Sequence, residues 1–254
     1  MSTCLLQFKP FLERHTAEAI DREGLPPTAP GSRYESFRFA FDRVLAAGGH
    51  TIVELGTMRS FVHGGLPGCN DDDPAYWHPE RPEDWDWGAG CFSLMAAICL
   101  ERTSPTIHTV DYVPAHIERC KVMTSPFAGL FHYHVCDSVD FLRSLPPGSV
   151  DLLYLDTGDM WPIEPTARHQ LAEVKALHRG KLLADSGLVL IDDVRNATPR
   201  RFGERSRLGK AKYSIPYLLR HGFEIVFDDY QVALTRSAAP CPRRLIDRFV
   251  RGAR

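Results

Sequence analysis

Long hydrophobic runs, a strong net charge and paired cysteine motifs are all missing from this chain, and each absence excludes a class of protein. No apolar stretch approaches the roughly 20 residues that a membrane helix needs, and the first residues contain too short an apolar run for a secretion signal. The formal net charge is −2 over 254 residues, which argues against binding nucleic acid by neutralising its phosphates. We therefore expect a soluble, cytoplasmic protein with neither a membrane nor a nucleic acid as partner.

The cysteines show no CxxC pair and no spacing typical of a metal site. There are seven of them, at positions 4, 69, 91, 99, 120, 136 and 241. An odd number of scattered cysteines is typical of reduced thiols in the cytoplasm. A chain of this size can bury enough apolar surface to fold without disulfides.

One short stretch is basic although the chain as a whole is not. Its members are Arg200, Arg201, Arg205, Arg207, Lys210 and Lys212. Such charge runs are usually solvated, so we expect an exposed loop here, with a local binding patch as the alternative.

Short apolar runs alternate with helical patterns along most of the chain. The runs predict strands at 50–56, 106–113, 132–136, 150–156 and 187–192, and a closing pair of strands at 223–228 and 231–236. Helices are expected at 34–47, 91–100, 114–123, 139–145, 166–178 and 208–221. This alternation predicts an α/β fold with a doubly wound, mostly parallel sheet covered by helices on both faces.

The chain divides into three parts on composition. Residues 1–48 form an N-terminal helical extension, residues 49–240 the main domain, and residues 241–254 a C-terminal tail. The extension could cover an acceptor site or build a homodimer, and the sequence leaves both open. A loop rich in Gly, Pro, Asp and Trp is inserted at 61–90. It is either a lid over a ligand or a loop folded on its own aromatic residues.

Acidic residues and a glycine follow the predicted parallel strands. Gly56 ends the first strand, where the absence of a side chain would let a ligand approach the backbone. Asp111 and Asp137 end the next two, and VDLLYLDTGD and SGLVLIDDV end in further carboxylates. Ligands of such sheets bind at the carboxyl ends of the strands. Any one of these aspartates could instead be a helix N-cap, but the ordered series favours a binding crevice.

This series resembles the class I S-adenosylmethionine-dependent methyltransferases, over about residues 50–236. The resemblance rests on Glu-Leu-Gly after the first strand, Asp after the second, Asp-Ser after the third and Leu-Asp at the fourth. It implies a seven-stranded, Rossmann-like methyltransferase sheet with an antiparallel last strand. One departure is the incomplete glycine-rich motif, because Gly56 is followed by Thr-Met-Arg.

The resemblance also implies roles for individual residues in binding S-adenosylmethionine. Asp111 would bind the ribose, Asp137 and Ser138 would approach the adenine, and Glu54 would lie near the methionine amino group above Gly56. The methionine carboxylate has Thr57, Arg59 and Ser60 as candidates. The complete predicted cofactor set is Glu54, Gly56, Thr57, Arg59, Ser60, Asp111, Tyr112, Asp137, Ser138 and Asp156.

The motifs LYLDTGD and LIDDV resemble those of metal-dependent small-molecule O-methyltransferases of the macrocin and aminocoumarin type. That resemblance implies that Asp156, Asp192 and Asp193 bind Mg²⁺ or another divalent cation, which prefers oxygen ligands. The ion would polarise a hydroxyl of a small-molecule methyl acceptor. Asp159 would be the general base, although one extra residue precedes it, and His169 is the reserve base.

Three other functions compete with this hypothesis. Asp156-Thr157-Gly158 matches the motif of aspartic proteases, but a second copy and a β-rich pattern are missing. A nicotinamide-dependent enzyme would need a G-x-G-x-x-G motif after the first strand, which is absent. The third alternative is a non-catalytic nucleotide- or S-adenosylmethionine-binding protein with the same fold.

Overall fold

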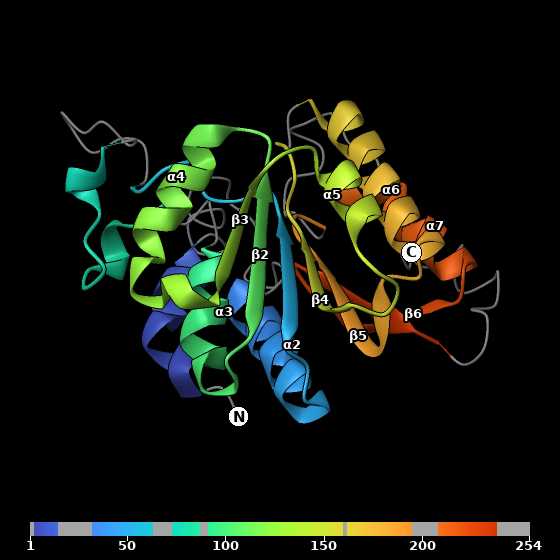
Figure 1. Cartoon of the computed structure of the whole chain (residues 1–254), viewed down its shortest axis with the longest axis horizontal. Coiled ribbons are helices and arrows are strands. Elements are labelled where there is room, and N and C mark those ends of the chain that lie inside the picture. Colours follow the sequence, from blue (N-terminus) through green and yellow to red (C-terminus); the bar gives the residue numbers. More distant parts are fainter. Residues whose placement is uncertain are drawn as a thin grey trace, which may run out of the picture.

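A seven-stranded sheet forms the centre of the molecule (Figure 1). The computed structural model describes residues 3–14, 32–62, 73–86, 91–159, 162–194 and 208–237. The strands are β1 (Thr51–Leu55), β2 (Thr106–Asp111), β3 (Phe131–Val135), β4 (Val150–Leu155), β5 (Leu183–Ile191), β6 (Phe223–Asp228) and β7 (Val232–Arg236). Their order across the sheet is β3-β2-β1-β4-β5-β7-β6.

The strand directions confirm the predicted doubly wound sheet. β1 pairs in parallel with β2 and β4, and the parallel set continues to β3 and β5. β7 lies antiparallel to both β5 and β6, so the last strand reverses as expected. The carboxyl ends of β1, β2, β3, β4 and β5 therefore meet at one edge of the sheet, where ligands of such folds bind.

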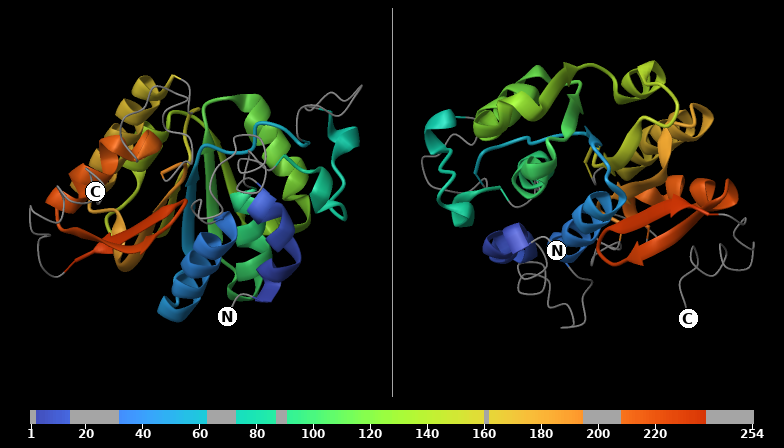
Figure 2. Two further views of the ribbon diagram at one scale, coloured as in Figure 1. Left: turned by 180° about the vertical axis from the view of Figure 1, so that it is seen from behind. Right: turned by 60° about the horizontal axis from the view of Figure 1, so that its bottom comes forward.

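Helices cover both faces of the sheet (Figure 2). One face carries α2 (Arg33–Ala47), α3 (Phe92–Leu100) and α4 (Pro114–Met123), and the other carries α5 (Ser138–Ser144), α6 (Ile163–Arg179) and α7 (Ser214–Arg220). Short 3-10 helices are η1 (Thr3–Phe8), η2 (Pro74–Tyr76), η3 (Pro82–Asp84), η5 (Glu101–Thr103), η6 (Ser125–Leu130) and η7 (Gly209–Lys212).

Side chains alternate along each central strand, and this alternation builds a core on each face. In β4, Leu152 and Tyr154 pack with α2 and α3, whereas Leu153 and Leu155 pack with α6 and α7. All four are at most 1% exposed. A strand buried on both faces reads as a continuous apolar run, which is why β4 was recognisable from sequence.

Most predicted elements differ from the observed ones by one to three residues at an end, and two differ more. β5 begins at Leu183, four residues before the expected start at 187. The helix expected at 208–221 is divided into η7 and α7. Gly209, the first residue of η7, has a φ of +50°, a left-handed conformation that prevents a regular α-helix from starting at 208.

The cysteines correct one expectation. Cys4 in η1 and Cys99 in α3 form a disulfide, with their Cα atoms 5.6 Å apart. The prediction that the thiols are reduced is therefore wrong for this pair, because tertiary contact brought together two cysteines that are 95 positions apart. Cys91, Cys120 and Cys136 are free thiols. Cys69 and Cys241 lie outside the described residues.

The described part of the insertion packs on its own aromatic residues and on the N-terminal segment. Trp85 is 1% exposed, and its ring centroid lies 4.7 Å from that of Trp77. Phe8 and Phe11 approach the same ring, at 5.7 and 5.3 Å. These contacts favour the self-packed loop over a lid for residues 73–86. His63, Cys69, Asp71, Asp72 and Trp87 lie outside the described residues.

A search of the described ranges for a long, apolar helix able to cross a membrane finds none.

Candidate active site

The turn after β1 is held against the end of β4. Gly56 has a φ of +80°, and a Cβ placed there would lie 2.6 Å from the carbonyl oxygen of Asp156. Glycine is therefore required at position 56 because the end of β4 approaches its backbone. The sequence had suggested that a ligand approaches there. Its effect is to bring the ends of β1 and β4 together.

Asp111, the predicted ribose ligand, fastens the end of β2 to the turn after β1. Its Oδ1 accepts a hydrogen bond from the backbone N–H of Val113 at 2.8 Å, and its Oδ2 accepts one from that of Thr57 at 3.1 Å. His116 Nδ1 lies 3.1 Å from Oδ2. Tyr112 follows with 78% of its surface exposed, so an aromatic face is available at this edge.

Glu54 is a carboxyl group enclosed at the end of β1. It is 2% exposed and accepts a hydrogen bond from the Ser93 hydroxyl in α3 at 2.6 Å. Burial raises the pKa of Glu54 to about 7, although the Ser93 hydrogen bond opposes the shift. A cationic ligand beside this side chain would favour its ionised form.

Asp137 and Ser138, the predicted adenine contacts, have partners within the protein. Asp137 caps α5, because its Oδ1 accepts the N–H groups of residues 139 and 140. The Ser138 hydroxyl donates to Glu173, which is fully buried in α6, and lies 2.8 Å from Nε2 of His169. The hydrogen bond to Glu173 raises the pKa of His169. This reserve base therefore belongs to the contact between α5 and α6.

Arg59 and Asp159 form an ion pair at the surface, between the segments that follow β1 and β4. The Nη1 atom lies 2.7 Å from Oδ1, and the two side chains are 54% and 70% exposed. Ser60, the third candidate for the methionine carboxylate, instead donates its hydroxyl hydrogen to the buried Asp86. The predicted base thus points to Arg59 on the neighbouring turn.

The three predicted metal ligands do come together. Asp156 follows β4, and Asp192 and Asp193 follow β5. A ligand oxygen of each lies within 4.8 Å of the others, and theirs is the only such acidic or metal-ligating trio among the described residues. The expected cluster at the carboxyl ends of the two strands is confirmed as a geometric arrangement.

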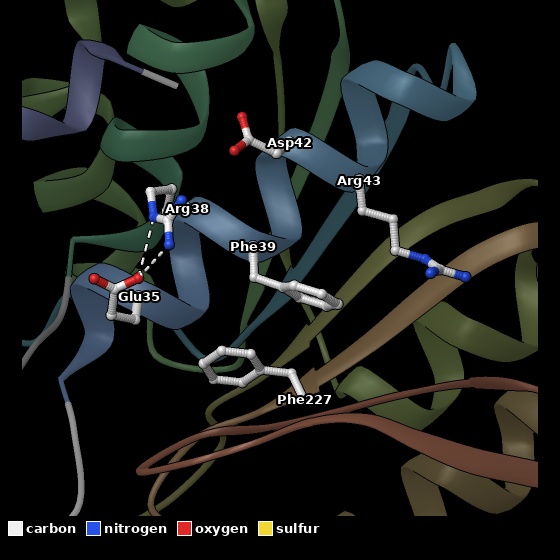
Figure 3. Close-up of a pocket in the computed structure, with 6 residues that line it drawn as sticks. All are labelled: Glu35, Arg38, Phe39, Asp42, Arg43 and Phe227. Carbon is white, nitrogen blue, oxygen red and sulfur yellow. Dashed lines mark hydrogen bonds and ion pairs between the residues drawn. The ribbon is translucent and has the colours of Figure 1, made fainter. Parts of the chain in front are cut away.

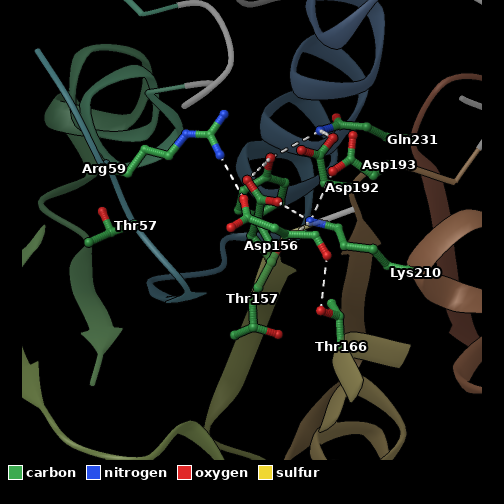
Figure 4. A network of polar contacts seen from close by, with 12 residues as sticks. Thr57, Arg59, Asp156, Thr157, Thr166, Asp192, Asp193, Lys210 and Gln231 are labelled. Atoms are coloured by element: carbon green, nitrogen blue, oxygen red, sulfur yellow. Dashed lines mark hydrogen bonds and ion pairs between the residues drawn. The ribbon is translucent and has the colours of Figure 1, made fainter. Parts of the chain in front are cut away.

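Lys210 enters this cluster from η7 (Figure 4). Its ammonium lies 2.7 Å from Oδ1 of Asp156, 3.0 Å from Oδ2 of Asp193 and 3.2 Å from the carbonyl oxygen of Gly158. The lysine side chain is only 1% exposed. The prediction of a solvated basic loop is wrong for Lys210, because the chain folds back onto the acidic edge. Arg200, Arg201, Arg205 and Arg207 lie outside the described residues.

Arg33, the first residue of α2, neutralises the third carboxylate. Its Nη2 lies 2.6 Å from Oδ2 of Asp192, and Nε lies 3.4 Å from Oδ1. Gln231 donates its side-chain N–H to the same Oδ1 at 2.7 Å and to the Tyr154 hydroxyl at 3.1 Å. Asp192 is 0% exposed, so both of its oxygens are enclosed by donors from the protein.

The backbone on either side of this network is unusual. Asp193 has a φ of +54°, which is uncommon for a residue other than glycine. A Cβ on Gly209 would lie 1.9 Å from the carbonyl oxygen of Asp193. Glycine at 209 therefore lets η7 dock against the end of β5 and bring Lys210 to the carboxylates.

The charges of the network are nearly balanced. Among the described residues, three carboxylates face the two cations Arg33 and Lys210. Burial and the neighbouring Asp192 raise the pKa of Asp156. Burial alone would lower the pKa of Lys210, but Asp156 and the two other carboxylates outweigh it and raise that pKa, so the ammonium stays charged.

This arrangement does not suit a divalent cation as the side chains lie. A metal ion needs free oxygen lone pairs, but Arg33 and Gln231 engage both oxygens of Asp192, and Lys210 lies between the other two carboxylates. Two neighbouring positive charges would also repel the ion. The residues form an internal ion network.

A pocket of 340 Å³ lies elsewhere, between α2 and β6 (Figure 3). Phe39 stacks on Phe227 from β6, with ring centroids 5.1 Å apart. The other lining residues are Glu35, Arg38, Asp42 and Arg43. None of the residues predicted to bind cofactor or metal lines this pocket, so it is separate from the candidate site.

Several solved protein structures share the fold of this chain. No family profile and no curated protein sequence matches the chain. Among solved structures, the SAH-bound methyltransferase PaMTH1 from Podospora anserina aligns with a TM-score of 0.53 and 14% identity, over 93% of this chain and 89% of that one. The chain has the fold of this methyltransferase.

Two further structures give the same result. The cofactor-bound protein Rv0187 from MTB aligns with a TM-score of 0.52 and 16% identity, covering 90% of both chains. A Staphylococcus aureus protein described as a caffeoyl-CoA O-methyltransferase aligns with a TM-score of 0.51 and 14% identity, over 92% of this chain and all of that one (100%). At these identities the likeness establishes the fold.

Proposed function

We propose that this protein is an S-adenosylmethionine-dependent methyltransferase that methylates a hydroxyl group of a small molecule, such as a sugar or another natural product. The observation that carries the proposal is the edge formed by Glu54, Asp111 and Tyr112. It combines an enclosed carboxyl group, a carboxylate anchored between two strand ends and an exposed aromatic ring.

Each part of the cofactor has a chemically suitable partner at this edge. The Asp111 carboxylate can accept hydrogen bonds from ribose hydroxyls, which is what an acidic residue after β2 does in dinucleotide-binding folds. Tyr112 offers an aromatic face to the adenine. Glu54 would ionise beside the methionine ammonium, because an opposite charge offsets the cost of burial.

The acceptor would bind beside Asp156, where the strand-four and strand-five motifs meet. Methyl transfer forms a bond between carbon and the acceptor oxygen while the bond between carbon and sulfur breaks, and the hydroxyl proton passes to a base. Asp159 stays the predicted base, and its exposed ion pair with Arg59 would have to open for this role. Holding the two reactants in line can supply up to about 7–11 kcal/mol of the barrier.

The choice of a small-molecule hydroxyl rests on the LYLDTGD and LIDDV motifs and their resemblance to the macrocin and aminocoumarin enzymes. The magnesium ion that this resemblance implies is not part of the proposal, because Lys210 and Arg33 already engage the three aspartates. A non-catalytic binding protein is the second candidate. The methyltransferase names of PaMTH1 and of the Staphylococcus aureus protein favour catalysis.

Titration calorimetry tests this function without knowledge of the acceptor. We expect S-adenosylmethionine and S-adenosylhomocysteine to bind one site per chain, and NAD⁺ under the same conditions to give no signal. Binding of NAD⁺ alone, or of none of the three compounds, would overturn the proposal. The protein is then incubated with S-adenosylmethionine and a panel of phenols and sugars. Formation of S-adenosylhomocysteine above the level without an acceptor would distinguish an enzyme from a binding protein.

A further inference from the structure

Lys210 has no role in the sequence patterns that point to methyl transfer, yet it is the most enclosed cation of the candidate site. Its side chain is 1% exposed, and it comes from η7, far along the chain from β4. A lysine is seldom buried without partners because the charged form loses its hydration. Its position therefore needs a physical explanation.

The ammonium group uses all its donors within the cluster. A protonated lysine has three N–H groups and no acceptor. Three oxygens lie within 3.2 Å of Nζ, from Asp156, Asp193 and Gly158. No donor remains for a methyl acceptor, so Lys210 acts on the carboxylates and has no direct contact with the reacting atoms.

The ammonium also lies between two of the three carboxylates that the sequence motifs assign to a metal ion. It contacts one oxygen from the end of β4 and one from the end of β5, which are the positions that the predicted metal would bridge. Arg33 and Gln231 engage the third carboxylate separately. A single positive charge tied to the chain thus joins the two strand ends.

The backbone supports this placement independently of the side chains. Gly209 lies so close to Asp193 that any side chain at 209 would collide with the Asp193 carbonyl oxygen, 1.9 Å away from a Cβ there. The segment before Lys210 is therefore built to pack directly on the strand end that carries the carboxylates. A flexible surface lysine could reach the carboxylates without a glycine at position 209, so the close packing of Gly209 indicates that this placement of Lys210 is built into the fold.

We infer that Lys210 is a positioning residue that replaces the divalent cation, so that Asp156, Asp192 and Asp193 form a metal-independent site. The role beside the acceptor rests on the proposed methyltransferase function. The ion network itself can be tested without measuring methyl transfer. Lys210 fixes Asp156 and Asp193 beside the acceptor, and no metal ion is needed to bring them together.

Manganese binding provides the decisive experiment. Mn²⁺ alone, a probe for oxygen-ligand sites that accept Mg²⁺, is titrated into the full-length wild-type protein and followed by electron paramagnetic resonance of the free ion. We expect no specific binding to wild type. The Lys210→Ala variant should gain one Mn²⁺ site per chain, because one positive charge has left the carboxylates. Lys210→Arg should behave as wild type.

Lys212→Ala is the matched control. Lys212 lies in the same 3-10 helix and pairs with Glu164 at 2.8 Å, outside the cluster, so its removal should leave Mn²⁺ binding unchanged. Stoichiometric Mn²⁺ binding to wild type would overturn the inference, and this arm needs no variant to fold. Tight binding to Lys210→Arg would overturn it too. S-adenosylmethionine calorimetry on the same samples reports separately on the proposed function.

Discussion

Arg33 and Asp192 form a buried ion pair between positions that are 159 residues apart, with Nη2 2.6 Å from Oδ2. The arginine begins the first helix that packs on the sheet, and the aspartate follows β5. The side chains are 4% and 0% exposed. This contact makes the N-terminal part of the chain a contributor to the candidate site.

Replacing Arg33 by methionine should lower the free energy of unfolding by about 3–5 kcal/mol, because it leaves a buried carboxylate without its cation. Urea denaturation measures the change. Arg38→Met, on the same helix, is the control: Arg38 pairs with Glu35 at the surface and should cost no more than about 1 kcal/mol. Equal decreases in the free energy of unfolding of the two variants would show that the buried pair stabilises the fold no more than the exposed pair does.

A second prediction concerns Gly209. Its substitution by alanine should destabilise the protein by about 2 kcal/mol or more beyond the cost of a left-handed alanine, because Cβ would collide with the Asp193 carbonyl. Gly222→Ala separates the two effects: Gly222 has a φ of +82° and open space around its Cβ position. Thermal unfolding of both variants gives the comparison, and similar melting temperatures would contradict the close docking of η7.

The buried Glu54 predicts a dependence of stability on pH. Its pKa in the folded protein is raised to about 7 from 4.5 by burial. The folded state therefore keeps a proton that the unfolded state releases, so the stability from this group is complete below pH 4.5 and is lost as pH rises to 7. The loss is on the order of 3 kcal/mol.

Glu54→Gln should flatten this part of the stability curve in denaturant titrations at several pH values. Exposed Glu118, which pairs with Lys121 at 2.7 Å, serves as the control, and Glu118→Gln should leave the slope unchanged. A Glu54→Gln curve that parallels wild type from pH 4.5 to 7 would rule out the raised pKa.

His108 predicts an effect of the opposite sign. Burial, followed by the nearby His134 and His132, lowers its pKa to about 4 from 6.5. The folded state then resists protonation, so stability falls as pH drops from 6.5 to 4. His108→Gln should be less sensitive to acid than wild type, as measured by melting temperature in that range. His50→Gln, at an exposed position, should retain the wild-type sensitivity.

The sequence predicted the sheet because the central strands are buried on both faces and therefore read as apolar runs. It also placed Asp156, Asp192 and Asp193 together, since the carboxyl ends of parallel strands share one edge. These inferences depend on local pattern and on general rules of topology, which a single sequence contains.

The partners of those carboxylates could not be predicted in the same way. Lys210 belongs to a run of basic residues that resembles a solvated loop, and Arg33 follows a proline-rich stretch with no motif around it. Their positions are set by tertiary packing: η7 docks through Gly209, and α2 packs on the sheet. The Gly-Lys pair at 209–210 is the only local feature that could have indicated the position of Lys210. It can be interpreted only when the packing of η7 against β5 is known.

The most direct test of the proposed function is the affinity of S-adenosylmethionine for wild type and for Asp111→Asn, measured by calorimetry. If Asp111 binds the ribose, the variant should bind about 10- to 100-fold more weakly, because hydrogen bonds to a charged acceptor are weakened. Asp140→Asn, at an exposed position beside Arg143, should bind as wild type does. Equal affinity in wild type and Asp111→Asn, or no binding to wild type, would contradict the proposed site.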